Sequence, residues 1–295
     1  MRQYLILDLA RFTLALGVVI WHYVHFTMFY NIENRFNFTY GGVFLVPGFW
    51  VISGVIFQFY YNEKIKNNLT TFKEFFILRF SRLYPLHFVT LILVLILQLI
   101  YHYVSGGNYF IYQYNDIKHF LMNLFFINYF KYHHYSFNAP IWSVCAEVLV
   151  YFLFFFLNKR HISILGHILL IILTFALQSK YQYVSDIIKC SRFFFVGCIL
   201  SILIDSNYYL SRVKSINIPF SEVLGNLTYS SYLIHFPIQL VIMIFITFFA
   251  LDGKGLVDSY WFFLFYIFFT FLLSYFVYKY FEMPMQKYLR KKLLK

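Results

Sequence analysis

Eight long apolar stretches, separated by short polar segments, constrain this chain more than any other feature of its sequence. A helix needs about 20 predominantly apolar residues to cross the hydrocarbon core of a bilayer. Hydrophobic residues make up 61% of the chain and charged residues 12%, against roughly 45–50% and about 25% in soluble domains. This composition excludes a soluble enzyme, a disordered chain and a coiled coil. It predicts an all-α fold, a polytopic transmembrane helical bundle.

We predict eight membrane spans within one domain that comprises residues 1–295. The expected spans are 4–24, 40–60, 84–104, 140–157, 161–178, 190–205, 228–250 and 260–281. A shorter apolar piece, 119–130, is expected to be re-entrant or interfacial. The amphipathic segment 62–83 is expected to lie along the inner membrane surface. The sequence shows no second soluble domain, internal repeat or long linker.

The distribution of positive charge predicts how the helices are oriented. The chain has 24 Lys and Arg against 12 Asp and Glu, a formal net charge of +12. Basic residues gather in the segment 64–82 and in the tail 279–295, whereas the loop 25–39 carries one Arg and one Glu. Because cytoplasmic loops are enriched in Lys and Arg, both basic segments and both termini are expected in the cytoplasm. The charge indicates contact with anionic lipid and not with nucleic acid.

Asp8, Arg11 and His22 are ionisable residues within the first apolar span. Arg11 and His22 are eleven positions apart, close to three full helical turns, so they share a face and lie ~16 Å apart along the axis. Asp8 lies one turn from Arg11 and can pair with it. Charged groups in apolar spans usually face the bundle interior and have a function. A structural ion pair with an interfacial histidine, or the proton relay of a transporter, are the alternatives.

Arg79 and Arg82 form a second polar cluster, at the expected cytoplasmic mouth of the third span, just before Tyr84 and Pro85. Arginines at positions i and i+3 share a helix face and can form a fork for a phosphate group. Anchoring of the helix by positive charge is the alternative.

A polar stripe of Ser143, Glu147 and Tyr151 recurs every four residues on an otherwise apolar helix. A glutamate inside a span is a functional-site hypothesis by default. The alternative is a neutral, protonated glutamate that is hydrogen-bonded to a neighbouring helix.

Two further clusters contain a helix-breaking or small residue. His235 precedes Pro237 by two positions, and a proline bend suits the wall of a cavity. A core histidine that satisfies the carbonyls freed by the proline is equally compatible with the pattern. In the second span, Ser53 precedes Gly54, which permits close helix approach or a local break. The three cysteines have no pattern that predicts a disulfide framework or a metal site.

Taken together and in order, these clusters resemble the motifs of the integral-membrane acyltransferase-3 family, which includes bacterial O-acetyltransferases of surface polysaccharides. The family's first helix carries an Asp, then an Arg three residues later, then a His with ten residues between it and the Arg. A Phe-rich Ser-Gly motif, a cytoplasmic arginine motif leading to Tyr-Pro, a Trp-Ser…Glu motif and a late Ser-Tyr…His-x-Pro motif follow. The matching residues are Asp8, Arg11 and His22; Phe49, Trp50, Ser53 and Gly54; Arg79, Arg82, Tyr84 and Pro85; Trp142, Ser143 and Glu147; Ser231, Tyr232, His235 and Pro237.

The resemblance covers essentially the whole chain, with two departures. Pro47 stands where the family often has an acidic residue, and Trp50 stands where it has Phe. The family implies about ten helices, so a bundle of eight to ten membrane helices is expected. It also implies a multi-pass protein of the bacterial cytoplasmic (inner) membrane, here a single-domain member without the hydrolase-like domain that some members carry.

The resemblance implies transfer of an acyl group, expected to be acetyl, from acyl-CoA to a hydroxyl of an extracytoplasmic saccharide such as a cell-surface polysaccharide. Acetyl-CoA would be a co-substrate, with no permanently bound cofactor and no metal. The implied catalytic residues are His22, Glu147 and Arg11. The implied acyl-CoA and substrate-binding residues are Asp8, Arg79, Arg82, Ser53, Trp142, Ser143, Tyr232 and His235.

Within that implied site, His22 is the expected general base, and an acyl-histidine intermediate is the second option. Glu147 would orient His22 or polarise the acceptor, and His235 is a candidate for the same duties. Arg79 and Arg82 would hold the CoA phosphates, with Arg11 beside the pantetheine arm.

Two other functional classes remain as alternatives. A membrane transporter or lipid-linked-sugar flippase would use the same residue types, but the matched broken helices of inverted repeats are not visible in the sequence. A non-catalytic membrane scaffold gives no reason for an arginine, a glutamate and two histidines inside apolar spans.

Overall fold

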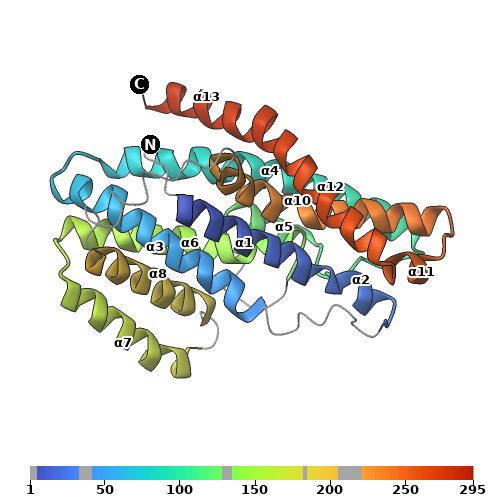
Figure 1. The fold of residues 1–295 in the computed structure, drawn as a ribbon, viewed down its shortest axis with the longest axis horizontal. Coiled ribbons are helices and arrows are strands. Elements are labelled where there is room, and N and C mark those ends of the chain that lie inside the picture. Colours follow the sequence, from blue (N-terminus) through green and yellow to red (C-terminus); the bar gives the residue numbers. More distant parts are fainter. Residues whose placement is uncertain (1–4, 33–41, 128–134, 182–184, 205–220, 295) are drawn as a thin grey trace.

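The computed structural model describes residues 5–32, 42–127, 135–181, 185–204 and 221–294 as a bundle of helices, with no strand in these ranges (Figure 1). The α-helices are α1 (Leu5–His22), α2 (Val24–Phe29), α3 (Gly42–Lys66), α4 (Phe72–Val104), α5 (Ile117–Leu124), α6 (Trp142–Lys159), α7 (Ile164–Lys180), α8 (Ser185–Leu203), α10 (Ser221–Phe248), α11 (Gly253–Val257), α12 (Tyr260–Val277) and α13 (Met283–Leu293). The 3-10 turn η1 (Ala139–Ile141) precedes α6, and the π-helical turn η3 (Tyr278–Glu282) joins α12 to α13.

The predicted membrane bundle is confirmed in its class. In the described part of the chain, six helical segments are long and apolar enough to cross a bilayer. The expected spans 161–178 and 190–205 coincide with α7 and α8. The apolar part of α7 is shorter than those six, and α8 carries charged residues.

The prediction that residues 62–83 form a helix along the inner membrane surface is wrong. Residues 62–66 end α3, and α4 begins at Phe72 and runs without a break for 33 residues, about 50 Å. Thr71 and Glu74 form a capping box that starts α4. The amphipathic pattern reflects the buried face of this long helix, because Phe75 and Leu83 are both in the core. A helix of this length exceeds the ~30 Å hydrocarbon core, so α4 extends beyond it.

The short apolar piece predicted over 119–130 overlaps α5, an eight-residue helix that begins at Ile117 and is too short to cross a bilayer. Asp116 caps its first turn by accepting a hydrogen bond from the backbone N–H of His119 at 2.9 Å. Residues 128–130 of the predicted segment lie outside the described residues.

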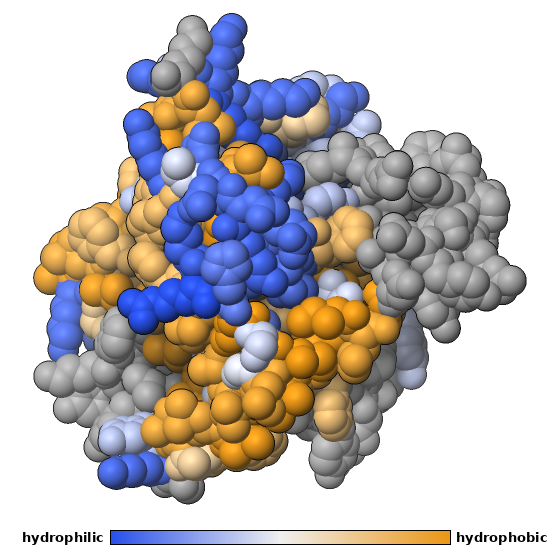
Figure 2. All heavy atoms as spheres, turned by 90° about the vertical axis from the view of Figure 1, so that its left-hand side faces the viewer, coloured by the Kyte–Doolittle hydropathy of each residue, from blue (hydrophilic) through white to orange (hydrophobic). Residues whose placement is uncertain are grey.

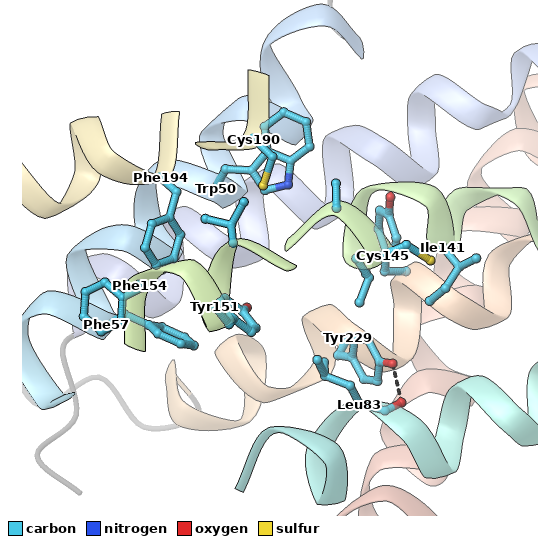
Figure 3. Packing of buried hydrophobic residues seen from close by; sticks show 14 of the residues in the cluster. Trp50, Phe57, Leu83, Ile141, Cys145, Tyr151, Phe154, Cys190, Phe194 and Tyr229 are labelled. Carbon is cyan, nitrogen blue, oxygen red and sulfur yellow. Dashed lines mark hydrogen bonds between the residues drawn. The ribbon is translucent and has the colours of Figure 1, made fainter. Parts of the chain in front are cut away.

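A close helix crossing joins α3 to α8, through one glycine on each helix. A Cβ placed on Gly54 would lie 1.9 Å from the carbonyl oxygen of Phe194, and one placed on Gly197 would lie 2.0 Å from that of Val51. Of the two readings of Gly54, the structure supports close helix approach, because α3 is continuous through it. Around this crossing the rings of Phe57, Tyr151 and Phe194 pack between α3, α6 and α8 (Figure 3).

An arginine in an apolar part of the bundle links α8 to α7 by hydrogen bonds. Arg192 on α8 donates hydrogen bonds from Nε to Thr174 Oγ1 at 3.1 Å and from Nη2 to Gln178 Oε1 at 2.6 Å. Its guanidinium also lies over the ring of Phe175. These contacts provide hydrogen-bond acceptors and an aromatic face for the guanidinium group, which explains how α8 accommodates a charged residue among apolar ones.

One end of the bundle is strongly hydrophilic. The beginnings of α1 and α4 and the ends of α3 and α13 lie toward the same side, at the left of Figure 1. Seen from that side, hydrophilic residues cover the centre and top of the molecule, and hydrophobic residues lie around them (Figure 2). The start of α1 and the end of α13 therefore share a side, as the charge distribution predicts.

Candidate active site

A cavity between α1, α3, α4, α6 and α10 brings together residues from all five motifs. The cavity volume, counted as the space that the centre of a water molecule can occupy, is about 90 Å³. Its lining consists of Arg11, Val46, Phe49, Trp50, Ser53, Arg82, Leu83, Ser143, Val144, Glu147, Tyr151, Thr228, Tyr229 and Tyr232. We call it the arginine cavity. Figure 3 shows Trp50, Tyr151, Tyr229 and Leu83 in this region, with the hydroxyl of Tyr229 bonded to the carbonyl of Leu83.

A second cavity of about 70 Å³ adjoins the arginine cavity. The two share Arg11, Ser53, Arg82, Leu83 and Tyr151 in their linings, and the second adds Ile56, Phe57 and Arg79. Arg79 lies nearer the start of α4 than Arg82, so the pair of cavities extends toward the hydrophilic end of the bundle. Six of the predicted site residues line the larger cavity, and Arg79 lines the smaller one.

Arg11 is held in place by groups on two helices. Its Nη1 lies 4.0 Å from Asp8 Oδ1 within α1, and its Nη2 donates to Thr228 Oγ1 on α10 at 3.3 Å. Gly225 makes room for the carboxylate, because a Cβ there would lie 2.4 Å from Asp8 Oδ1. The predicted pairing of Asp8 with Arg11 is thus present, and Arg11 still lines both cavities.

A buried carboxylate that sequence analysis missed lies beside these arginines. Glu282 accepts a hydrogen bond from Ser230 at 2.5 Å and is within electrostatic reach of Arg82 and Arg11. In the sequence it falls between the last apolar span and the basic tail, where a glutamate looks like a solvated residue. The π-helical turn η3 directs it into the bundle, and hydropathy does not predict that turn.

Arg290 also joins the site, although sequence analysis assigned it to the tail. It donates from Nε to Ser81 Oγ at 3.2 Å, and it lies within electrostatic reach of Arg79 and Arg82. Arg79 itself donates to Tyr61 and packs against the rings of Phe57 and Tyr61, 4.9 and 5.0 Å from their centroids. Three guanidinium groups therefore converge where α13 crosses the first part of α4.

Glu147 belongs to the arginine cavity. Ser53 and Tyr151 are its hydrogen-bonding neighbours, and Arg11 and Arg79 are within electrostatic reach. One carboxylate oxygen, Oε1, is buried without a hydrogen-bond partner among the described residues. These four neighbours of Glu147 line one or both of the two cavities, and none of them is a histidine.

His22 is buried in the bundle, with 8% of its surface exposed, and lines neither cavity. Its Nδ1 lies 2.9 Å from the carbonyl oxygen of Val18. A carbonyl can only accept a hydrogen bond, so Nδ1 carries the proton and Nε2 carries the lone pair of the neutral ring.

His235 is the partner of His22. The two ring centroids are 4.6 Å apart. His235 Nδ1 lies 3.2 Å from the carbonyl oxygen of Ser231, which assigns its tautomer in the same way, and its Nε2 is buried without a partner in the described structure. Two imidazoles, each with its lone pair on Nε2, thus lie side by side. His235 lines neither cavity. It is a core histidine bonded to the carbonyl of Ser231, whereas the carbonyl of Leu233, which Pro237 leaves without its helical partner, accepts from Asn138 Nδ2 at 2.9 Å.

Tyr232 lies between the arginine cavity and the two histidines. Its ring lines the cavity and lies 6.1 Å from the ring of His235. Its hydroxyl donates to the carbonyl of Pro140 at 2.6 Å, so Ser143, also at 2.6 Å, donates to it. Trp142 does not line the arginine cavity, but its ring lies 5.9 Å from that of Trp50, which does.

A third histidine was not singled out in the sequence. His25 fell in the loop expected outside the membrane, but it is buried in α2, 5.1 Å from the ring of His22 between centroids. The i, i+3 spacing from His22 was the signal that could have found it. Within the described ranges, no group of three or more His, Cys, Asp or Glu side chains is arranged to hold a metal ion.

Comparison with known proteins gives one match. A family model described as "Acyltransferase domain" (Acyl_transf_3) matches residues 4–204. No curated protein and no solved structure matches the chain. The matched range contains α1 to α8, and with them Arg11, His22, Arg82 and Glu147. It ends before α10, which carries His235.

Proposed function

The chain belongs to the acyltransferase-3 family and is a membrane acyltransferase, and we propose that it transfers an acyl group from acyl-CoA to a hydroxyl of an extracytoplasmic saccharide. Acetyl is the proposed acyl group and a cell-surface polysaccharide the proposed acceptor. In this proposal acyl-CoA is a co-substrate that enters from the cytoplasm.

The observation that carries the proposal is the arginine cavity with its cluster of guanidinium groups. Arg11 and Arg82 line the cavity, and Arg79 and Arg290 lie at the end nearest the hydrophilic face. Guanidinium groups bind phosphate in a bidentate manner, and CoA carries several phosphates at one end of a long, thin arm. The arrangement suits a ligand whose phosphates stay at the mouth while its arm enters the bundle.

His22 is the proposed general base. Its Nε2 takes the proton of the acceptor hydroxyl while the hydroxyl oxygen attacks the thioester carbonyl carbon. The carbon–sulfur bond then breaks, the CoA thiolate leaves, and the imidazolium returns a proton to the sulfur. An acyl-histidine intermediate is the second route to the same products. Ser53, Trp142 and Ser143 are the proposed donors to the carbonyl oxygen during attack.

Tyr232 separates the place proposed for the arm from the place proposed for the chemistry. It lines the arginine cavity and lies beside His235, which in turn contacts His22. The thioester therefore passes Tyr232 to reach the two histidines. In this arrangement Glu147 acts on the acyl-CoA arm, and His235 is the nearest group to share the base function of His22.

The proposed location is the bacterial inner membrane, with both termini cytoplasmic. The last turn of α3 carries Lys64 and Lys66, and the last turn of α13 carries Arg290, Lys291 and Lys292. Both helix ends lie toward the side of the bundle at the left of Figure 1, which is the hydrophilic side (Figure 2). Positive charge of this kind is typical of the cytoplasmic face. The proposed partners are acyl-CoA, the saccharide and the lipid bilayer.

Membranes that contain the protein, supplied with acetyl-CoA labelled in the acetyl group, test this function. We expect label to move to polysaccharide, and membranes without the protein give the background. Solute movement without label transfer would instead favour a transporter or flippase.

Substitution of Arg82 by alanine is expected to raise KM for acyl-CoA about tenfold, because a charge-assisted contact to phosphate is lost. Arg290→Gln is expected to raise it in the same direction, since Arg290 joins the same cluster. Steady-state kinetics on purified protein measures both. Lys73→Ala is the matched control, because it removes a positive charge from an exposed position near the start of the same helix. Equal effects of all three variants would mean that Arg82 only anchors the helix.

A further inference from the structure

Gln239, which lies on α10 one turn beyond His235, contacts three groups around His22. It is fully buried. Its Nε2 donates to the carbonyl oxygen of His22 at 2.8 Å and to the hydroxyl of Tyr266 at 3.2 Å. Its Oε1 lies 2.8 Å from Nδ1 of His25. Both the nitrogen and the oxygen of the Gln239 side-chain amide are thus hydrogen-bonded to groups that surround His22.

The directions of these hydrogen bonds follow from the partners. The carbonyl of His22 can only accept, so the amide nitrogen must face it and the amide oxygen must face His25. His25 therefore carries its proton on Nδ1. Its Nε2, 3.2 Å from the hydroxyl of Tyr112, accepts from that hydroxyl. One consistent chain of bonds runs from Tyr112 through His25 to Gln239 and His22.

The backbone of His22 needs a partner from another helix. α1 ends at His22 and α2 begins at Val24, and a carbonyl at the end of a helix has no partner within it. The turn between the two helices uses the carbonyls of Ile20 and Tyr23, which accept from Tyr23 N and Phe26 N at 3.1 Å. The carbonyl of His22 is bonded to Gln239.

We propose that Gln239 is a positioning residue for His22, and that His25 and Tyr112 hold Gln239 in place. The proposal rests on the proposed acyltransferase function. His22 is fixed at two points, its ring by the carbonyl of Val18 and its backbone by Gln239. The same helix that carries Gln239 carries His235, so one contact sets the distance between the two imidazoles.

Gln239→Met is the first test, because methionine is similar in length and makes none of the hydrogen bonds. We expect kcat per folded molecule to fall about 100-fold, the size of effect that a small misplacement of a reacting group produces. KM for acyl-CoA is expected to stay within twofold, because the arginine cavity does not include Gln239. The fraction of folded protein is measured by size-exclusion chromatography in detergent.

Asn158→Leu is the matched control. Asn158 is a buried amide on α6 that donates only within its own helix, to the carbonyl of Phe154 at 2.8 Å. A role of Gln239 in folding alone would make the two variants alike, with less folded protein and unchanged kcat per folded molecule. That result would overturn the proposal.

The second test uses His25→Asn and His25→Leu. These two variants test the proposal even if Gln239→Met does not fold. Asparagine can present an N–H where His25 has Nδ1, whereas leucine cannot. We expect His25→Asn to retain at least a third of wild-type kcat and His25→Leu to lose about tenfold. Equal loss in both variants would assign His25 a proton-transfer role and overturn its part in the proposal.

Different results contradict the proposed function and the positioning role of Gln239. A wild-type protein that transfers no label from acetyl-CoA contradicts the proposed function. A wild-type protein that transfers label, together with a Gln239→Met variant of equal kcat, contradicts only the positioning role.

Discussion

Replacement of His22 by alanine is expected to abolish acyl transfer while the protein stays folded in the membrane. General bases contribute typically 10²–10⁴-fold, and a loss of this size is expected in kcat. The physical reason is that Nε2 of His22 carries the lone pair in the tautomer that the Val18 carbonyl selects. Transfer of labelled acetyl groups from acetyl-CoA, measured per folded molecule, checks the prediction.

His167→Ala is a closely matched control for this variant. His167 on α7 is buried, and its Nδ1 lies 2.8 Å from the carbonyl of Ser163, the same i−4 arrangement as in His22. It contacts neither of the two cavities nor the other histidines. We expect His167→Ala to keep its activity per folded molecule. Wild-type activity in His22→Ala would end the proposal that this imidazole is the base.

Gly54→Ala is expected to prevent folding of the bundle. The added Cβ would lie 1.9 Å from the carbonyl oxygen of Phe194, and a backbone atom cannot rotate away as a side chain can. α3 and α8 would have to separate along a crossing that Gly197 makes equally close. Overpacking of a well-packed site costs typically 1–3 kcal/mol, and the rigid backbone obstacle places this case at or above the upper end.

Gly48→Ala in the same helix provides the comparison. A Cβ on Gly48 would meet the end of the Leu14 side chain, at 2.9 Å, and that side chain can change its rotamer. We expect Gly48→Ala to accumulate near wild-type amounts and Gly54→Ala to be largely lost, as measured by fluorescence-detected size-exclusion chromatography in detergent. Similar yields of the two variants would show that the helices can separate at small cost.

Much of the fold could be predicted because hydropathy is a local property of the chain. The apolar runs predicted a membrane bundle, and helices lie at each expected span. The segment 62–83 was misread because an amphipathic pattern looks the same whether its apolar face meets lipid or other helices. Phe75 and Leu83 face other helices, and no residue between Phe72 and Val104 ends the helix.

The candidate site was predicted only as separate pieces. Arg11 and His22 share one face of α1, as the spacing requires, but they serve different surroundings: Arg11 lines the arginine cavity, and His22 meets His235. Glu147, a candidate to orient His22, has its contacts around Ser53 and Tyr151. Spacing along one helix cannot say which neighbouring helix each turn will meet.

The sequence by itself determined the class of protein, the helical segments and the polar residues placed inside them, because hydropathy and helical period act over a few turns of chain. The tertiary structure alone decided that Glu282 and Arg290 join the arginines and that His25 and Gln239 surround His22. These contacts depend on which faces of distant helices meet. That choice is made by close packing, as at Gly54 and Gly197, where backbone must touch backbone.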